Sequence, residues 1–114
     1  YIIMKRNIIY SNEYIDFVKC SSKRAQDKLR YATSILENIK IISYKFVKKL
    51  VGTDFYELRI SVDNEIRVIL FAVDHENIND ARNVIFLNGF VKKDTKEYKK
   101  EIDRAISILK RALY

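Results

Sequence analysis

The sequence predicts an α+β domain: a small, mainly antiparallel sheet with an N-terminal helical hairpin packed on one face, and a C-terminal helix. Apolar residues alternate with polar ones between Phe55 and Leu70, the period of strands that present one face to a core. They recur at intervals of three and four in residues 12–39 and 94–113, the period of amphipathic helices. With 114 residues, 48% of them apolar, the chain is expected to form one domain over residues 1–114.

The N-terminal part predicts a strand followed by two helices. Residues 2–10 are largely β-branched and apolar, which favours a strand. Ser11 can cap the next helix with its hydroxyl, and the pair Ser21-Ser22 is expected to separate that helix from a second one. The apolar stripe of the second helix consists of Ala25, Leu29, Ala32, Leu36 and Ile39. Two such helices in succession predict a hairpin that covers a sheet.

The register of the following strand pair determines where its two arginines lie. A three-residue loop over 62–64, with Asn64 in the left-handed conformation, pairs Leu58 with Val68 and keeps apolar residues together. The same register pairs Arg59 with Arg67. Side-by-side arginines repel each other, so we expect an anion between them. The alternative is that each arginine pairs with a nearby carboxylate, such as Glu57 or Glu65.

The remaining strands are expected on both sides of this pair. Residues 44–51 predict a short strand that ends in a turn at 52–54. The apolar run 84–87 predicts a central strand that Gly89 ends. Asp94, with Glu97 three residues later, can cap the last helix. Its apolar stripe is Tyr98, Ile102, Ala105, Ile106, Leu109 and Leu113.

The charge of the chain favours an anionic partner. Lysine and arginine number 22 against 15 acidic residues, a net charge of +7, which suits nucleic acid, an acidic protein or an anionic membrane. No apolar run reaches the ~20 residues that span a bilayer, so we expect no membrane insertion. A lone Cys20 needs no oxidising compartment, which indicates the cytoplasm. One Cys, one His and scattered carboxylates predict neither a metal site nor another cofactor.

Basic residues concentrate around the start of the last helix, where cations are unfavourable unless a phosphate binds. The cluster consists of Lys92, Lys93, Lys96, Lys99 and Lys100. We expect RNA to contact Arg59, Lys48, Lys49, Lys96, Lys99 and Lys100. His75 is expected in an exposed loop away from this cluster. Without a histidine pair or a carboxylate in an evident base role, the site should have weak acid–base power.

Three segments together resemble one protein family: FYELR, NEIRV, and a strand leading through G-F-x-K-K into the helix K-K-E-I-x-x-A. They are similar to the RelE/HigB superfamily of toxins from bacterial and phage toxin–antitoxin modules, in particular its phage-derived HigB-like branch. The resemblance covers nearly the whole chain. It implies a metal-independent endonuclease that cuts mRNA in the ribosomal A site, and a cognate antitoxin, which we expect to be a helix-turn-helix protein.

The resemblance also implies the catalytic residues. Arg67 stands where the family has its principal strand arginine, Lys92 or Lys93 where a second cation follows the glycine, and Tyr98 where some members have a tyrosine. The branch usually reads T-x-K-T-P-x-K-E here, and this chain lacks the proline. Tyr98 therefore fits either a catalytic role or the buried stripe of the helix.

These residue types suit RNA cleavage by attack of a 2′-OH on the adjacent phosphate. The planar fork of arginine fits two phosphate oxygens, and a lysine among other cations can give or take a proton. Tyr98 could protonate the departing 5′ oxygen or stack on a base. Two other functions remain open at this point: a basic RNA-binding module without catalysis, and a protein-interaction domain for an acidic partner.

Overall fold

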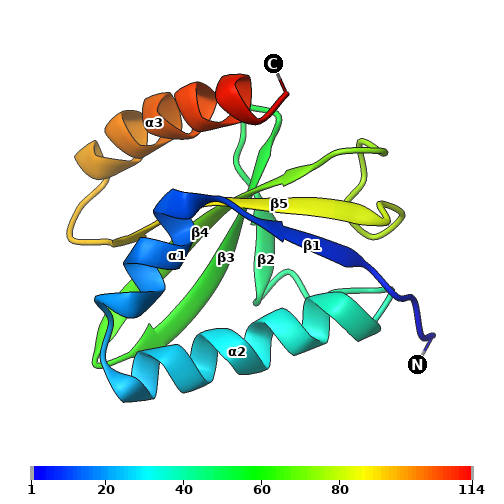
Figure 1. The fold of residues 1–114 in the computed structure, drawn as a ribbon, viewed down its shortest axis with the longest axis horizontal. Helices are drawn as coiled ribbons and strands as arrows, with labels where there is room; N and C mark the ends of the chain where they lie inside the picture. Colours follow the sequence, from blue (N-terminus) through cyan, green and yellow to red (C-terminus); the bar gives the residue numbers. More distant parts are fainter. Residues whose placement is uncertain (1, 114) are drawn as a thin grey trace.

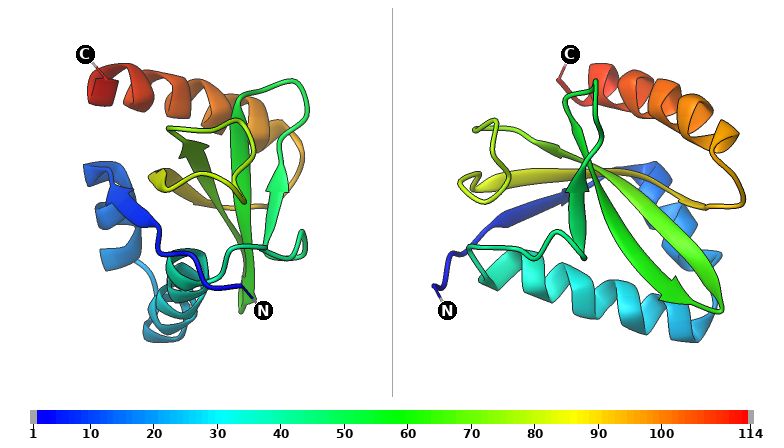
Figure 2. Two further views of the ribbon diagram at one scale, coloured as in Figure 1. Left: turned by 90° about the vertical axis from the view of Figure 1, so that its right-hand side faces the viewer. Right: turned by 180° about the vertical axis from the view of Figure 1, so that it is seen from behind.

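The computed structural model describes residues 2–113 and confirms the predicted α+β class. Five strands form one sheet in the order β1-β5-β4-β3-β2, and all neighbours except the parallel pair β1 and β5 are antiparallel. Helices α1 and α2 cover one face of the sheet, and α3 covers the other (Figures 1 and 2). The predicted helical hairpin on one face and separate C-terminal helix are therefore both present.

Side-chain caps begin the two N-terminal helices as the sequence predicted. Helix α1 spans Asn12–Lys19, and the Ser11 hydroxyl accepts a hydrogen bond from the backbone N–H of Tyr14 at 3.0 Å. Helix α2 spans Lys23–Asn38, and Ser22 caps it in the same way. The predicted stripe of α2 is buried from Ala25 to Leu36, where it packs on the sheet.

The strands are β1 Asn7–Tyr10, β2 Val47–Lys49, β3 Phe55–Val62, β4 Asn64–Ala72 and β5 Asn83–Val91. Strands β1 and β2 are shorter than the ranges 2–10 and 44–51 predicted. Residues 2–6 instead run beside the end of α2, where the backbone N–H groups of Met4 and Arg6 donate to the carbonyls of Asn38 and Glu37. This lateral contact, rather than strand propensity, determines where β1 begins.

The prediction that Gly89 ends the central strand was wrong, because β5 continues through it to Val91. Glycine is required there for close packing. A Cβ atom at Gly89 would lie 2.4 Å from the Cδ2 atom of Phe17 on α1. The glycine therefore lets α1 approach the sheet, and it does not break the strand.

The predicted register of the β3–β4 hairpin is confirmed: Leu58 pairs with Val68, and Arg59 with Arg67. The left-handed residue is Asp63, with φ of 59°, and not Asn64 as predicted. Apolar residues on the α2 side of these strands form the first core, whereas those on the other side form a second core beneath α3.

An irregularity in the β4–β5 pairing changes which residues of β5 face α3. Ile69 pairs with Asn88, but its neighbour Leu70 pairs with Phe86, so the pairing skips Leu87. Such a bulge leaves two consecutive residues on one side. Leu87 packs in the second core, and the Asn88 amide donates to the backbone and side-chain oxygens of Glu101 on α3.

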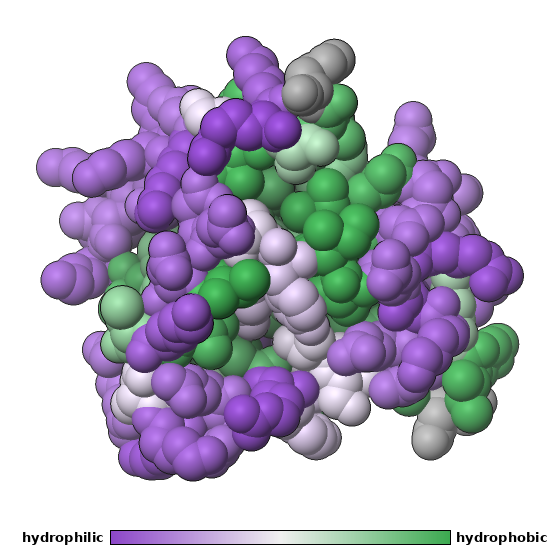
Figure 3. Space-filling view, in the orientation of Figure 1, coloured by the Kyte–Doolittle hydropathy of each residue, from purple (hydrophilic) through white to green (hydrophobic). Residues whose placement is uncertain are grey.

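Helix α3 spans Lys96–Leu113 and buries Ala105 and Ile108. The predicted stripe was wrong at Ile106 and Leu113, which are 39% and 51% exposed. Both residues line a groove between α3 and the turn that precedes β3, so this side of the helix does not reach the sheet. Figure 3 also shows apolar surface below the C-terminal end of α3.

Arg6 is a buried basic residue that the sequence did not single out. Its side chain is 2% exposed and donates only to backbone carbonyls, at the end of α2 and in the loop between β4 and β5. The acceptors are Leu36, Ile39, Lys40, Ile78, Asn79 and Ala81. Burial lowers the pKa of this guanidinium, opposed by nearby Asp80. Arg6 thereby links the end of α2 to the β4–β5 loop through its side chain.

Candidate active site

The register of three strands places charged residues in rows on the face that α3 covers. Arg59, Arg67 and Phe90 occupy one row across β3, β4 and β5. In the adjacent row, the backbone N–H of Lys92 donates to the Glu65 carbonyl at 2.8 Å. The first turns of α3 cross these rows, and the Tyr98 ring packs edge-on against Phe90, with centroids 5.4 Å apart. The fold thus brings Arg67, Lys92 and Tyr98 into one cluster.

Arg67 is 5% exposed, because the start of α3 closes over it. Its Nη1 atom donates to the carbonyl of Ile66 at 3.0 Å and lies 3.4 Å from Oε2 of Glu65. Its Nε atom is buried and has no hydrogen-bond partner within residues 2–113. An unpaired buried donor costs about 1–3 kcal/mol, so a ligand oxygen at this position would remove a penalty.

Both arginines have carboxylate neighbours, which is the alternative arrangement that the sequence left open. The Nε atom of Arg59 lies 3.7 Å from Oε1 of Glu57, and Arg67 approaches Glu65. Ser61 donates to the Glu65 carboxylate, and this hydrogen bond, helped by Arg67 and Lys92, lowers the pKa of Glu65. The contacts of the two arginines are long for charge-assisted hydrogen bonds, which are normally about 2.7–2.9 Å.

Glu57 is the functional candidate that the sequence analysis missed. Its side chain is buried, and its Oε2 atom accepts a hydrogen bond from the Tyr98 hydroxyl at 2.6 Å. The sequence predicted no carboxylate in an evident base role, and the structure places the Glu57 carboxylate in contact with one of the predicted catalytic residues. Strand alternation could have identified it, because Glu57 lies two residues before Arg59 and so on the same face of β3, the face on which Arg67 of β4 also lies.

Tyr98 belongs to the second core and to the charged cluster at the same time. Its ring packs on Phe90, and Nζ of Lys92 lies 5.7 Å from the ring centroid. Burial raises the pKa of Tyr98 to about 12; the hydrogen bond to Glu57 adds to this, whereas Arg67 opposes it. The hydroxyl therefore stays protonated at neutral pH.

Carboxylates cap the beginning of α3, as predicted. Oε1 of Glu97 accepts from the backbone N–H groups of Lys93 and Asp94, at 2.7 and 3.0 Å, and Oδ1 of Asp94 accepts from that of Lys96. These acceptors already satisfy the helix N-terminus. The side chain of Lys93, the remaining catalytic candidate, is exposed.

The other predicted RNA contacts do not converge on Arg67. Lys96, Lys99 and Lys100 are all exposed. At 100° per residue, Lys96 and Lys100 lie on the side of α3 that is turned away from Tyr98, and Lys99 lies on its flank. They form an outer basic surface around the site.

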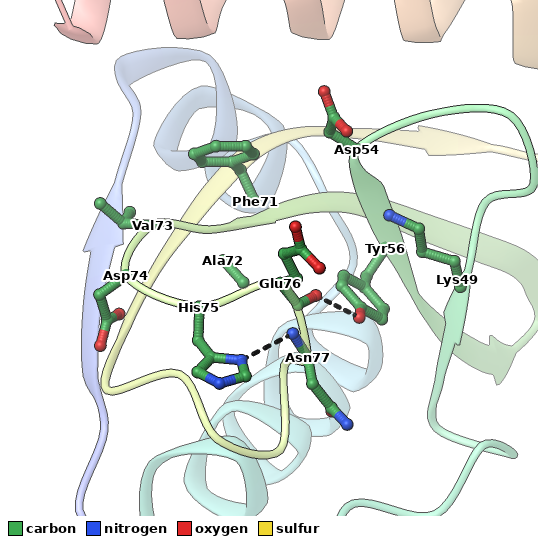
Figure 4. A pocket seen from close by; sticks show the side chains of 10 residues that line it. All are labelled: Lys49, Asp54, Tyr56, Phe71, Ala72, Val73, Asp74, His75, Glu76 and Asn77. Carbon is green, nitrogen blue, oxygen red and sulfur yellow. Dashed lines mark hydrogen bonds between the residues drawn. The ribbon is translucent and has the colours of Figure 1, made fainter.

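Lys48 and Lys49 lie on opposite faces of the sheet, since consecutive strand residues alternate. Lys48 pairs with Glu57 on the α3 face, whereas Lys49 pairs with Tyr56, and its Nζ atom lies 5.0 Å from the Tyr56 ring centroid. Lys49 therefore lines a separate pocket together with the loop that follows β4 (Figure 4).

That separate pocket contains His75, which lies in an exposed loop as predicted. Its Nδ1 atom accepts a hydrogen bond from the backbone N–H of Asn77 at 3.0 Å, and the Tyr56 hydroxyl donates to the Glu76 carbonyl (Figure 4). None of the residues that line this pocket belongs to the Arg67 cluster. The histidine consequently has no place in the candidate active site.

A comparison with known families shows the family to which the chain belongs. The model of the family described as "Phage derived protein Gp49-like (DUF891)" matches residues 16–110, which include Glu57, Arg67, Lys92 and Tyr98. The chain belongs to this family. The Gp49-like proteins are a RelE/HigB-like toxin family, and such a toxin implies an antitoxin partner. No curated protein matches the chain. In the described part of this Gp49-like protein, no helix is long and apolar enough to cross a membrane.

Proposed function

We propose that this Gp49-like toxin is a ribosome-dependent endoribonuclease that cleaves mRNA by attack of a 2′-OH on the adjacent phosphate. The observation that carries the proposal is Arg67, a buried guanidinium whose Nε–H has no partner in the described chain. A phosphate oxygen supplies the acceptor that this N–H lacks, and two oxygens match the arginine fork.

The groups around Arg67 support phosphoryl transfer without a cofactor. Charge accumulates on the non-bridging oxygens as the 2′ oxygen attacks, and a preorganised cation in a water-poor site stabilises that charge. Arg59 lies directly opposite Arg67 on β3, and Lys92 lies in the next row, where its backbone N–H donates to the Glu65 carbonyl. The exposed lysines 93, 96, 99 and 100 then hold the RNA backbone outside the reacting phosphate.

The burial of the Arg67 side chain supports dependence of cleavage on the ribosome. Arg67 lies beneath α3, so a flexible free RNA must be bent and held for its phosphate to reach the guanidinium. Positioning of this kind can lower the barrier of an enzymatic reaction by as much as ~7–11 kcal/mol. We infer that the ribosomal A site supplies it, in the cytoplasm, and that a helix-turn-helix antitoxin prevents it by binding the toxin.

The test compares one mRNA in two states, free and bound in a programmed ribosome, with wild-type protein and Arg67→Met. We expect rapid cleavage only on the ribosome and only with the wild type. Equal cleavage of free RNA would refute the dependence on the ribosome. Tight RNA binding without cleavage would favour the non-catalytic RNA-binding module, and neither activity would favour a protein-interaction domain.

A further inference from the structure

Asn88 is a polar residue beneath α3, beside the apolar side chains of the second core. It is 1% exposed and pairs with Ile69 in the sheet, at the bulge that turns Leu87 and Asn88 to the same side. Its Nδ2 atom donates to the backbone carbonyl of Glu101 at 3.1 Å and to Oε1 of the same residue at 3.0 Å. Its Oδ1 atom is buried and has no hydrogen-bond partner within residues 2–113. The amide is thus only half satisfied.

Stability alone does not favour an asparagine at this position. An unpaired buried oxygen is unfavourable, and an apolar side chain of similar size, such as leucine, would fill the same space without one. The amide adds a directional contact. Apolar contacts between a helix and a sheet tolerate small displacements, whereas a hydrogen bond to one particular carbonyl oxygen specifies one position. A single buried asparagine fixes the register of coiled-coil helices in this way.

Two residues of α3 make side-chain hydrogen bonds with the sheet within residues 2–113: Glu101 with Asn88, and Tyr98 with Glu57. Ile108 and the other residues of α3 in the second core make apolar contacts. Tyr98 and Glu101 are three positions apart, so they lie on the same side of the helix and about 4.5 Å apart along its axis. The Asn88 contact therefore determines where the Tyr98 ring lies over the sheet.

A different register of α3 would disturb the candidate active site. A shift by one residue would move the helix about 1.5 Å along its axis and turn it by about 100°. Tyr98 would then lose its place edge-on against Phe90 and its 2.6 Å hydrogen bond to Glu57. The shift would also change how the start of α3 covers Arg67, which is 5% exposed. A misplacement of only ~1 Å can slow an enzyme about 10²-fold.

We propose that Asn88 and Glu101 are positioning residues for cleavage, which hold α3 at the one position on the sheet that keeps Tyr98 beside Arg67. The proposal rests on the ribonuclease function proposed above. Both residues act through the helix and need no contact with RNA. The Glu101 side chain is 13% exposed, and Nη1 of Arg104 lies 3.8 Å from the same Oε1 atom that Asn88 contacts. This ion pair keeps the carboxylate directed at the amide.

The experiment measures single-turnover cleavage of an mRNA in programmed ribosomes, together with unfolding in urea. Asn88→Leu should be about as stable as the wild type, because removal of the unpaired oxygen offsets the lost hydrogen bonds. It should nevertheless cut about 10–10²-fold more slowly at saturating toxin. The toxin concentration that gives the half-maximal rate should stay the same, since the exposed lysines are unchanged. Ile108→Val is the matched control: it removes a methyl group from the second core, so it should be less stable but cut like the wild type.

The position of α3 is checked directly by nuclear Overhauser contacts between the rings of Tyr98 and Phe90 in the free protein. These contacts should be present in the wild type and in Ile108→Val, and weakened or lost in Asn88→Leu. Glu101→Leu tests the same hydrogen bond from the helix side if Asn88→Leu does not fold, and it should also slow cleavage. Glu101→Gln should recover most of the rate, because its amide oxygen can still accept from Asn88.

Three results would overturn the positioning role. The first is a folded Asn88→Leu that cuts at the wild-type rate, and the second is slow cleavage by Asn88→Leu with unchanged contacts between Tyr98 and Phe90. The third is an equal loss of rate in Glu101→Gln and Glu101→Leu, because the charge and not the hydrogen bond would then matter. Failure of the wild type to cut would instead refute the ribonuclease function itself.

Discussion

Arg59 and Arg67 lie directly opposite each other on β3 and β4, yet each guanidinium faces a different carboxylate. Glu57 is buried beside Arg59, whereas Glu65 is exposed beside Arg67. The exposed partner is the one that an incoming phosphate can displace at little cost, since solvent-exposed ion pairs contribute only about 0–1 kcal/mol. This asymmetry supports Arg67 as the proposed phosphate ligand, with Arg59 remaining beside Glu57.

Replacement of Arg67 should slow cleavage strongly, whether or not the volume of its side chain is kept. Arg67→Ala should reduce the cleavage rate by about 10²–10³-fold, the typical effect of losing one preorganised charge stabiliser. Arg67→Lys should recover only part of this loss, since it keeps the charge without the fork.

The burial of Arg67 calls for a control of the fold. Because the side chain is buried, Arg67→Ala can also create a cavity, so Arg67→Met serves as the volume-matched variant. Cleavage rates and thermal unfolding should be measured on the same preparations. Wild-type cleavage by folded Arg67→Met would show that the guanidinium is not the reacting cation.

Arg6 should be among the residues on which stability depends most. Arg6→Ala leaves several buried carbonyl oxygens without donors, and we expect it to lower the free energy of unfolding by about 3 kcal/mol or more. Arg6→Lys should recover little, since one ammonium cannot reach both the end of α2 and the β4–β5 loop. Urea unfolding measures both effects.

The control for Arg6 is Arg30→Ala, an exposed arginine on α2 whose contact is a surface ion pair with Asp27. Its loss should change the free energy of unfolding by less than about 1 kcal/mol. If the two alanine variants unfold at the same urea concentration, the buried hydrogen bonds of Arg6 do not hold the fold together.

Gly89→Ala should destabilise the protein because the added methyl group collides with α1, and not because it disrupts strand β5. The added methyl would overlap the Phe17 ring, and overpacking of this kind costs about 1–3 kcal/mol. Phe17→Leu in the same chain should recover part of the loss, which a double-mutant cycle in urea would detect as coupling. Strictly additive effects would place the strain elsewhere.

Local patterns were sufficient to predict the sheet. The β3–β4 register followed from the alternation of Leu58, Val68 and their neighbours, because a slip of one residue would turn the apolar side chains outward. The caps at Ser11 and Glu97 also followed from the sequence, since each involves residues only three or four positions apart. Interactions this short depend little on the rest of the fold.

The sequence could not predict contacts that depend on how the elements cross. Tyr98 and Glu57 are 41 positions apart and meet only because α3 passes over β3. Arg6 reaches acceptors as many as 75 positions away. Likewise, helical periodicity could not distinguish Ile106 from Ile108, since the angle at which α3 crosses the sheet decides which one is buried.

Acidification should loosen the β4–β5 loop through Asp74. Hydrogen bonds from the backbone N–H groups of Arg82 and Asn83, the first of these foremost, lower the pKa of Asp74. A carboxyl whose pKa is lower in the folded state stabilises the fold above its unfolded pKa, about 3.9. That contribution is lost as the pH falls through the lower folded value.

The measurement is the free energy of unfolding of wild type and Asp74→Asn as a function of pH. The wild type should be the more stable at neutral pH, because the amide retains one acceptor oxygen but no charge. The difference should shrink as the pH drops below about 4, because the unfolded chain then binds a proton that folded Asp74 takes up only at lower pH. Asp54→Asn is the control, since Asp54 lies in the turn before β3 and not in the β4–β5 loop, and it should follow the wild type throughout. A gap between wild type and Asp74→Asn that stays constant down to the acid limit would show that the charge on Asp74 does not hold this loop.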